Sequence, residues 1–502
     1  MSIKFLKLFT FIFIISNLIV FAQPITIDST FGNKGIVLTS TGNGNDVANS
    51  VAFQNDGKII VAGNNNNDIV LVRYNIDGKI DNTFGNNGIE VTNLGGSTDI
   101  GASLVILPDN KIIVGGYSGN YPKYYFALAR FNPYGKLDSS FGENGKTITS
   151  IGTISDAGRS IALQSDGKII VAGYSNSSSN SIFALIRYND DGSLDSSFDS
   201  DGKVTTTIGI ANSIIRTIAI QSDEKIIVSG YSYSKSSFDY EVVVARYNKN
   251  GSLDNSFGNG GIITTDNLNG NDYGESILIQ KDKKILVAGY SFTGFVSLIR
   301  YNPNGSIDNT FSNNGKFSFQ FGAIYQNDFS SILQDDGKII VCGFSNRNNT
   351  NSSFSMIRIN TLGLIDNSFG IDGIVVTKIG IGNDVATSVI LQKDGKIVLA
   401  GKSFNGKDYD IALVRYNNTM VSTDFNEKSS ISKLLHITIR DRVLDVICNN
   451  NSIVTLQIID LLGNVFFDQK FNKNIIVSNL KKGFFFLKIS VGINCYFEKI
   501  LI

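Results

Sequence analysis

Short apolar runs alternate with segments rich in Gly, Asn and Asp along most of this chain. The clearest unit is Gln-Asn-Asp-Gly-Lys-Ile-Ile-Val-Ala-Gly at 54–63, and close copies stand at 164–173 and 334–343. With weaker copies the unit occurs seven times, and its lysines are 53 to 59 residues apart. A period of this size indicates a repeat protein. The lysines are Lys58, Lys111, Lys168, Lys225, Lys284, Lys338 and Lys396.

Each repeat contains four strand-like runs rich in Val, Ile, Leu and Tyr. In the first full copy they span 50–54, 58–63, 69–75 and 88–92. Asn55-Asp56-Gly57 joins the first two as a hairpin turn, in which Gly relieves the cost of positive φ. Three copies lack this glycine and carry Asn110, Glu224 and Lys283 instead. The turn therefore favours glycine without requiring it.

A second motif follows the third run, from Arg73 through Asp81 to Phe84-Gly85. We expect the arginine to form a partly buried pair with an aspartate, the phenylalanine to pack one repeat on its neighbour, and the aspartate to bind turn amides. The arginines are Arg73, Arg130, Arg187, Arg246, Arg300, Arg358 and Arg415. The phenylalanines are Phe31, Phe84, Phe141, Phe198, Phe257, Phe311 and Phe369. The aspartates are Asp28, Asp81, Asp138, Asp195, Asp254, Asp308 and Asp366.

Seven evenly spaced four-stranded units predict an all-β, seven-bladed β-propeller. The ends of the array support a closed ring. An orphan fourth strand at 35–40 precedes the first copy, and the last copy has only three runs, at 388–392, 396–401 and 411–417. We expect the N-terminal strand to complete the last blade, which removes exposed sheet edges.

These two motifs also resemble those of the delta-60 repeat family, whose members carry Asp-x-Ser/Thr-Phe-Gly and Asp-Gly-Lys-Ile-x-Val-x-Gly. The resemblance covers about residues 28–417. It implies a propeller-like secreted protein and brings no substrate or catalytic residue with it.

The N-terminus is typical of a secretory signal. Lys4 and Lys7 precede an apolar run at 8–21, and small residues at 20–22 offer a cleavage site near Ala22. A retained membrane anchor is the alternative, although the run is short for a span. We therefore divide the chain into a signal peptide (1–22), a propeller (23–418), a linker (419–430) and a C-terminal β-sandwich (431–502), with no transmembrane span in the mature protein.

The C-terminal segment resembles the sorting domain of the type IX secretion system of Bacteroidetes. That family carries an Asp-x-x-Gly turn followed by an Asn-Leu-x-x-Gly-x-Tyr run. The matching residues are Asp460, Gly463, Asn479, Leu480 and Gly483, whereas Phe485 replaces the tyrosine. The Pro-Asn-Pro usual at the start of the domain and a final basic residue are absent. The resemblance implies the type IX machinery as a partner and a secreted or outer-membrane surface location.

Composition narrows the chemistry. The chain has 44 Lys and Arg residues and 44 Asp and Glu residues, so it carries no net positive charge that would favour binding of nucleic acid. The one histidine, His436, lies in the C-terminal segment, so the propeller has no histidine for a nucleophilic triad or a multi-histidine metal site. We expect His436 to be an ordinary strand residue. Cys342 is expected to be a buried free thiol, and pairing of Cys448 with Cys495 stays open.

Acidic residues precede the first strand in six repeats, at Asp46, Asp99, Asp156, Asp272, Asp328 and Asp384. Calcium needs six to eight oxygens, commonly with several carboxylates on one loop. Because each loop offers only one or two acids, we expect a structural role and no cofactor, with calcium as the alternative.

The loops between strands two and three, and between blades, must share one face of the disc, and they differ strongly among copies. Loops on a rigid scaffold commonly bind ligands. A second variable position lies in the innermost strand, just before a recurrent hydroxyl residue. From these loops and this strand position we select candidate ligand-binding residues. The alternative is that the variation on this exposed face is unselected drift. The candidate residues are Asn49, Arg159, Arg216, Glu275, Tyr117, Tyr121, Tyr124 and Tyr231.

The sequence favours a secreted or cell-surface, non-catalytic binding module whose ligand is carbohydrate or protein, and we expect a monomer. Tyr, Asn and Ser suit sugar rings and hydroxyls. A carbohydrate-active lyase or hydrolase is the first alternative, and it would need paired carboxylates, which only Glu275 and the loop acids could supply. A structural or adhesive surface protein is the second.

Overall fold

The computed structural model describes residues 25–418, apart from 177–179, 268–269, 292–293, 321–328 and 347–350, together with the strands between 435 and 501. The chain divides into two compact units, Met1–Thr419 and Met420–Ile502, and each is described by itself. The predicted signal peptide lies outside the described residues. Among the described residues, no helix is long and apolar enough to cross a membrane.

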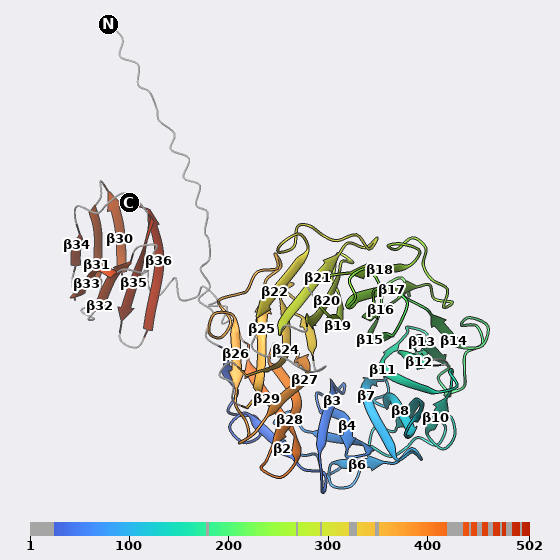
Figure 1. Ribbon diagram of the computed structural model, residues 1–502. Helices are drawn as coiled ribbons and strands as arrows, with labels where there is room; N and C mark the ends of the chain where they lie inside the picture. The colour runs from blue at the N-terminus through green and yellow to red at the C-terminus, as the bar shows by residue number, and fades with distance from the viewer. Residues whose placement is uncertain are drawn as a thin grey trace. The chain divides into compact units, whose positions relative to one another are not determined.

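The first unit is a ring of seven antiparallel sheets (Figure 1). The first blade contains β3 (Asp46–Phe53), β4 (Ile59–Asn65), β5 (Asp68–Tyr74) and β6 (Ile89–Thr92), in that order from the centre outward. The predicted runs are therefore strands, although the innermost one begins four residues before Ser50.

The next five blades repeat this order. The second has β7 (Thr98–Ile106), β8 (Ile112–Asn120), β9 (Lys123–Phe131) and β10 (Lys146–Thr149). The third has β11 (Ser155–Leu163), β12 (Ile169–Asn176), β13 (Ser181–Tyr188) and β14 (Lys203–Thr206). The fourth has β15 (Ser213–Ile220), β16 (Ile226–Tyr233), β17 (Tyr240–Tyr247) and β18 (Ile262–Thr265). The fifth has β19 (Asp272–Ile279), β20 (Ile285–Ser291), β21 (Phe295–Tyr301) and β22 (Lys316–Gln320). The sixth has β23 (Ser330–Leu333), β24 (Ile339–Ser345), β25 (Ser353–Ile359) and β26 (Ile374–Thr377).

The two ends of the array meet in the seventh blade. Its strands β27 (Asp384–Leu391), β28 (Ile397–Phe404) and β29 (Tyr409–Asn417) come from the end of the array. The N-terminal strands β1 (Thr26–Ile27) and β2 (Ile36–Thr39) both pair with β29, with Ile36 opposite Val414. The predicted seven-bladed ring and its closure by the N-terminal strand are confirmed.

The core lies between neighbouring blades. Val61 and Val70 of the first blade form one cluster with Leu413 and Val398 of the seventh. Each blade has a neighbour on both faces, so the second strand is buried on both sides, and Ile59, Ile60, Val61 and Ala62 are all 0% exposed. This double burial explains why the sequence shows continuous apolar runs there rather than alternation.

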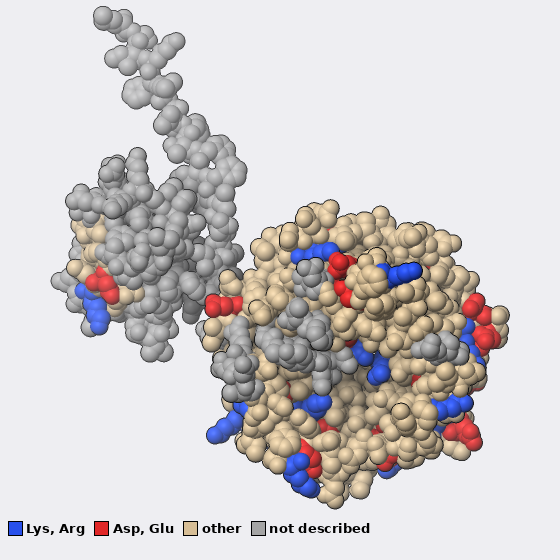
Figure 2. Space-filling view, viewed as in Figure 1, with Lys and Arg blue, Asp and Glu red and all other residues tan. Residues whose placement is uncertain are grey.

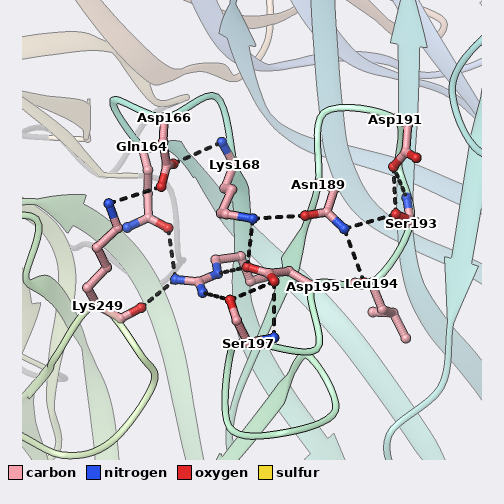
Figure 3. Close-up of polar contacts among 11 residues, drawn as sticks. Gln164, Asp166, Lys168, Asn189, Asp191, Ser193, Leu194, Asp195, Ser197 and Lys249 are labelled. Carbon is pink, nitrogen blue, oxygen red and sulfur yellow. Dashed lines mark hydrogen bonds and ion pairs between the residues drawn. The ribbon is translucent and has the colours of Figure 1, made fainter.

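A charged cluster links the strands of each blade (Figure 3). In the third blade, Asp195 Oδ2 lies 2.6 Å from Arg187 Nε and 3.0 Å from Lys168 Nζ. Its Oδ1 accepts hydrogen bonds from the amide and hydroxyl of Ser197. Arg187 Nη1 also donates to the carbonyl of Lys249 in the next blade. The carboxylate therefore joins the first-to-second turn, the third strand and the turn after it.

The same Arg–Asp–Lys cluster occurs in all seven blades. The expected Arg–Asp pair is present in each, whereas sequence reasoning missed the lysine of the Asp-Gly-Lys motif. The clusters are Arg73–Asp81–Lys58, Arg130–Asp138–Lys111, Arg187–Asp195–Lys168, Arg246–Asp254–Lys225, Arg300–Asp308–Lys284, Arg358–Asp366–Lys338 and Arg415–Asp28–Lys396.

The recurrent phenylalanine packs against its own arginine and the next blade. Phe198 is 0% exposed, and the guanidinium carbon of Arg187 lies 4.5 Å from its ring centroid. A Cβ placed on Gly251, in the fourth blade, would lie 3.1 Å from this ring. The interblade packing predicted for the phenylalanine is confirmed.

In the described part of the second unit, seven strands form two antiparallel sheets. Their bounds are β30 (Leu435–Arg440), β31 (Val443–Cys448), β32 (Val454–Ile459), β33 (Val465–Phe471), β34 (Asn474–Val477), β35 (Phe484–Val491) and β36 (Asn494–Leu501). The strand orders are β30-β31-β34 and β33-β32-β35-β36. His436 lies in β30, as expected of a strand residue. The motif residues Asp460, Gly463, Asn479, Leu480 and Gly483 lie outside the described residues.

Candidate functional site

A β-bulge interrupts the innermost strand of six blades. In β3 the pairing with β4 skips from Ala48 to Ser50, so Asn49 has no partner across the ladder. A bulge turns its side chain out of the regular alternation and into a new direction. The bulged residues are Asn49, Ala102, Arg159, Arg216, Glu275 and Thr387. These are the variable positions that the sequence marked before the recurrent hydroxyl.

The second-strand glycine faces this bulge. A Cβ on Gly173 would lie 1.9 Å from the carbonyl oxygen of Ala157, and one on Gly63 would lie 1.8 Å from that of Val47. Both are backbone atoms, so no side chain can move aside. The final glycine of the Ile-Ile-Val-x-Gly motif is therefore required by the bulge.

Small bulged residues bond to the next blade. Thr387 Oγ1 donates to the carbonyl of Ala48 at 2.5 Å, and Asn49 Nδ2 donates to the carbonyl of Gly101 at 2.9 Å. Asn49 also donates to Asn64 Oδ1 at 3.1 Å. Asn49, selected from the sequence as a ligand residue, is thus engaged between two blades.

Two bulged residues of opposite charge meet. Arg216 Nε lies 2.7 Å from Glu275 Oε2, and only 11% and 4% of their side chains are exposed. Burial by itself lowers the pKa of Arg216, but the charge of Glu275 and its hydrogen bond raise that pKa above its ordinary value. Arg216 and Glu275 therefore neutralise each other rather than projecting as free charges.

Arg159 has a different environment. Its guanidinium carbon lies 5.4 Å from the ring centroid of Tyr117 and 5.6 Å from that of Tyr174. Within the described part of the chain, the guanidinium has no hydrogen-bond acceptor, and its Nε is buried. Two cation–π contacts hold this cation in place without neutralising its charge.

Aromatic side chains continue this cluster from blade to blade. Tyr231 meets Tyr273 edge to face at 4.8 Å, Tyr273 stacks on Tyr290 at 4.8 Å, and Tyr290 stacks on Phe329 at 5.5 Å. Tyr117, Tyr174, Tyr231 and Tyr290 occupy one repeat position, directly after the bulge-facing glycine. We call the set Tyr117, Tyr174, Tyr231, Tyr273 and Tyr290 the tyrosine arc.

Burial moves the pKa values of four of these phenols further above neutral pH. It raises the pKa of Tyr273 to about 12 and also raises the pKa values of Tyr117, Tyr231 and Tyr290. At neutral pH the half-buried side chains of Tyr117, Tyr231 and Tyr273 therefore offer parts of their rings and neutral hydroxyl groups, whereas Tyr290 is only 5% exposed. Of the other predicted tyrosines, Tyr124 packs edge to face on Tyr117 at 5.4 Å, and Tyr121 is 85% exposed in the loop between β8 and β9.

The sequence pointed to Tyr117 and Tyr231 but missed Tyr174, Tyr273 and Tyr290. The position after the recurrent glycine was a usable signal, because four successive copies carry tyrosine there. Tyr273 lies on the first strand of its blade, outside that pattern. Its stacking on Tyr290 depends on the three-dimensional arrangement of the strands, which the sequence does not show.

The variable face consists of the second-to-third-strand loops and the interblade loops. Asparagine side chains form hydrogen bonds between these loops. Asn212 Oδ1 accepts from the amide of Ser181, and Asn271 Oδ1 accepts from that of Tyr240, both at 2.9 Å. Asn45 Oδ1 accepts from the amide of Tyr409 at 3.2 Å, which joins the first blade to the seventh. The loops are thus tied across blade boundaries, and the rim beside the tyrosine arc is a braced surface.

The loop acids bind backbone amides. Asp384 is 0% exposed, and its two oxygens accept from the amides of Ile379 and Gly380 at 2.8 and 3.0 Å. Asp156 accepts from the amides of Ile151 and Gly152. In the described part of the chain, no three His, Cys, Asp or Glu side chains gather in a metal-binding group. Asp328 lies outside it, and the Cys342 thiol is buried and forms no disulfide among the described residues, as predicted.

Figure 2 shows a hollow at the centre of the ring, with Lys and Arg side chains on its wall. A separate groove of about 600 Å³ lies at the outer strands of the third to fifth blades. Its lining has neither charged nor aromatic side chains and includes Thr207, Ile208, Asn259 and Ser306. The tyrosine arc and Arg159 offer more specific chemistry than this groove.

Family comparisons agree with the architecture. The model of a domain of unknown function, the DUF5122 β-propeller, matches seven segments, 54–84, 107–141, 164–198, 221–257, 280–311, 334–369 and 392–419. The secretion system C-terminal sorting domain matches 432–502. The chain contains seven DUF5122 β-propeller repeats and a type IX sorting domain. The tail makes it a secreted or outer-membrane surface protein.

No curated protein matches this chain. Solved structures similar in fold include virginiamycin B lyase from Staphylococcus aureus, at 12% identity and a TM-score of 0.47, covering 76% of this chain and 98% of that one. An ulvan lyase is similar at 13% identity and a TM-score of 0.46, covering 75% and 95%. The extracellular domain of a putative hybrid two-component system from B. thetaiotaomicron is similar at 12% identity and a TM-score of 0.40, covering 94% and 58%. These similarities carry no argument about the function of this chain.

Proposed function

We propose that this protein is a non-catalytic saccharide-binding module that displays its variable face outside the cell. The observation that carries the proposal is the tyrosine arc, which gathers ring faces and neutral phenols from four blades beside the braced loops. Aromatic faces stack on the C–H faces of sugars, and phenols and amides exchange hydrogen bonds with sugar hydroxyls.

We propose no reaction because the environment of Glu275 does not suit a catalytic carboxylate. A lyase or hydrolase would need paired carboxylates facing the ligand. Glu275 is buried against Arg216, and Asp272, on the same strand, is 0% exposed and accepts from the amide of Asn267. Retention of the saccharide without product formation is the behaviour that fits these environments.

The test is saturable binding of the purified full-length protein to a panel of polysaccharides, followed by isothermal titration calorimetry. Tyr231→Ala should weaken binding about 10-fold, because one ring face of the arc is lost. Tyr134→Ala is the matched control, because Tyr134 is 65% exposed in a third-to-fourth-strand turn on the opposite face. Melting temperatures of both variants show whether the fold is intact.

The proposal fails if no polysaccharide binds or if both substitutions act equally. Formation of new reducing ends or unsaturated sugar products, abolished by Glu275→Gln, would establish the enzymatic alternative instead.

A further inference from the structure

The third and fourth blades place an arginine at the same bulge, but only one of the two is neutralised. Arg216 Nε lies 2.7 Å from a carboxylate oxygen of Glu275. Arg159 lies between the rings of Tyr117 and Tyr174 and has no hydrogen-bond acceptor among the described residues. The Arg159 side chain is half-buried, and its Nε is fully buried, where a polar group is costly unless a partner compensates it.

Two loop acids of the second and third blades are already engaged. Asp156, three residues before Arg159 in β11, is 1% exposed and accepts from the amides of Ile151 and Gly152. Asp99 of the second blade is 0% exposed and accepts from the amide of Leu94 and the hydroxyl of Ser118. Both carboxylates hold interblade loops, so neither compensates the guanidinium of Arg159.

We propose that Arg159 binds the carboxylate or sulfate group of an acidic saccharide, with the tyrosine arc contacting the sugar rings. This inference rests on the proposed saccharide-binding function and names its ligand class. A guanidinium presents a rigid fork of N–H donors that matches carboxylate and sulfate oxygens. The ring faces of Tyr117 and Tyr174 fix the plane of that fork before a ligand arrives, which lowers the ordering cost of binding.

The charge of Arg159 reaches beyond its two flanking rings. It also acts on the phenol of Tyr231, where it partly offsets the rise in pKa caused by burial. Tyr231 in turn packs edge to face on Tyr240 at 5.2 Å and on Tyr273 at 4.8 Å. An acid group on Arg159 therefore places its sugar, or the next one along, beside these rings.

The experiment compares polygalacturonate and dextran sulfate with neutral dextran, using the full-length protein. We expect both acidic polymers to bind at least about 10-fold more tightly than dextran, and binding to weaken as salt rises. Arg159→Ala should lower the affinity for the acidic polymers about 10-fold or more, because a charge-assisted hydrogen bond is lost. Arg159→Gln, closer in shape, serves if the alanine variant does not fold.

Lys402→Ala is the matched control. Lys402 occupies the repeat position of Tyr117 and Tyr174 in the seventh blade, and its Nζ lies 5.5 Å from the ring centroid of Tyr409. The substitution removes one positive charge from the same face and should leave the affinity within about twofold, because Lys402 is half-buried in the seventh blade and does not belong to the tyrosine arc.

Three outcomes overturn the inference. Equal loss of binding in Lys402→Ala and Arg159→Ala would show unspecific attraction to the face. Competition by poly-glutamate as strong as that by polygalacturonate would assign Arg159 to acidic peptides. Binding of neutral dextran that is lost in Tyr231→Ala but kept in Arg159→Ala would leave the saccharide-binding function intact and refute only the acidic ligand.

Discussion

Asp28 Oδ2 lies 2.8 Å from Arg415 Nε, although 387 positions separate the two residues. Elsewhere in the ring the same pair forms within one blade, as between Asp195 and Arg187. The motif at the start of the chain therefore supplies the carboxylate that the last blade lacks. Side-chain chemistry closes the ring together with the pairing of β2 and β29.

This relationship predicts different consequences for two equivalent substitutions. Asp28→Ala and Asp195→Ala should each destabilise the protein by about 3 kcal/mol, because each leaves an arginine and a lysine without their carboxylate. Only Asp28→Ala should loosen the closure, and it should speed hydrogen exchange of the β29 amides without changing β13. Equal exchange in β29 of both variants would contradict a special role for Asp28.

Acid should unfold the propeller through these clusters. Burial alone would raise the pKa of Asp138, but hydrogen bonds from Ser140 and Lys111 and the charge of Arg130 lower it from 3.8 to about 2. The pKa values of Asp28, Asp81, Asp195, Asp254 and Asp308 are lowered further. A carboxylate with a lowered folded-state pKa stabilises the fold fully above its unfolded value, and this stability is lost as pH falls through the folded value.

We therefore expect the free energy of unfolding to fall steeply between about pH 4 and pH 2, as measured by urea titration at several pH values. Asp138→Asn should make the fall shallower, because one titrating group is removed. An unfolding free energy that stays constant down to pH 2 would show that the clusters contribute no net stability.

Substitutions at two glycines of the Asp-Gly-Lys-Ile-x-Val-x-Gly motif should destabilise the protein to different degrees. Gly173→Ala should cost about 1–3 kcal/mol, because its Cβ would overlap the Ala157 carbonyl. Gly167→Asn should cost less than about 1 kcal/mol, because nothing lies within 4 Å of its Cβ, and Asn110 adopts φ 65° at the equivalent turn. Urea midpoints measure both, and a larger loss at Gly167 would disprove the bulge argument.

The Arg216–Glu275 pair should behave as one unit. Glu275→Leu or Arg216→Met alone should destabilise by about 3–5 kcal/mol, since each leaves a buried charge. The double substitution should recover most of that loss, because two apolar groups of similar size fill the site. A double-mutant cycle from thermal unfolding measures the coupling, and strictly additive losses would show that the two side chains act independently.

The seven blades were predictable because their strands are bounded by local turn chemistry. Asp56-Gly57 and its counterparts form the same hairpin in every copy, and such signals need no knowledge of distant contacts. The interblade packing of Phe84 followed from its recurrence and its apolar ring. The charge and bulk of Arg73 likewise indicated a buried partner. Lys58 was missed because two strands, β4 and β5, separate it from Asp81 in the sequence.

The candidate site was less predictable for a geometric reason. The residue type at the repeat position of Arg159, Arg216 and Glu275 differs between copies, which marked these residues as unusual. Only the register shift in the structure shows that a bulge sets the direction of their side chains. Whether two bulged residues meet depends on the angle between neighbouring blades. Arg216 and Glu275 therefore looked like two independent ligand contacts, whereas the ring places them together.

The pairing of β2 with β29 also sets an order of events during synthesis. The ribosome makes residues 36–39 first and residues 411–414 hundreds of residues later, so the closing contact has one of the largest sequence separations in the chain. Contacts of this kind form slowly, because the intervening loop must lose its freedom before they bring any stability. Until the last blade has left the ribosome, β2 has no partner. The ring can therefore close only once β29 has been made.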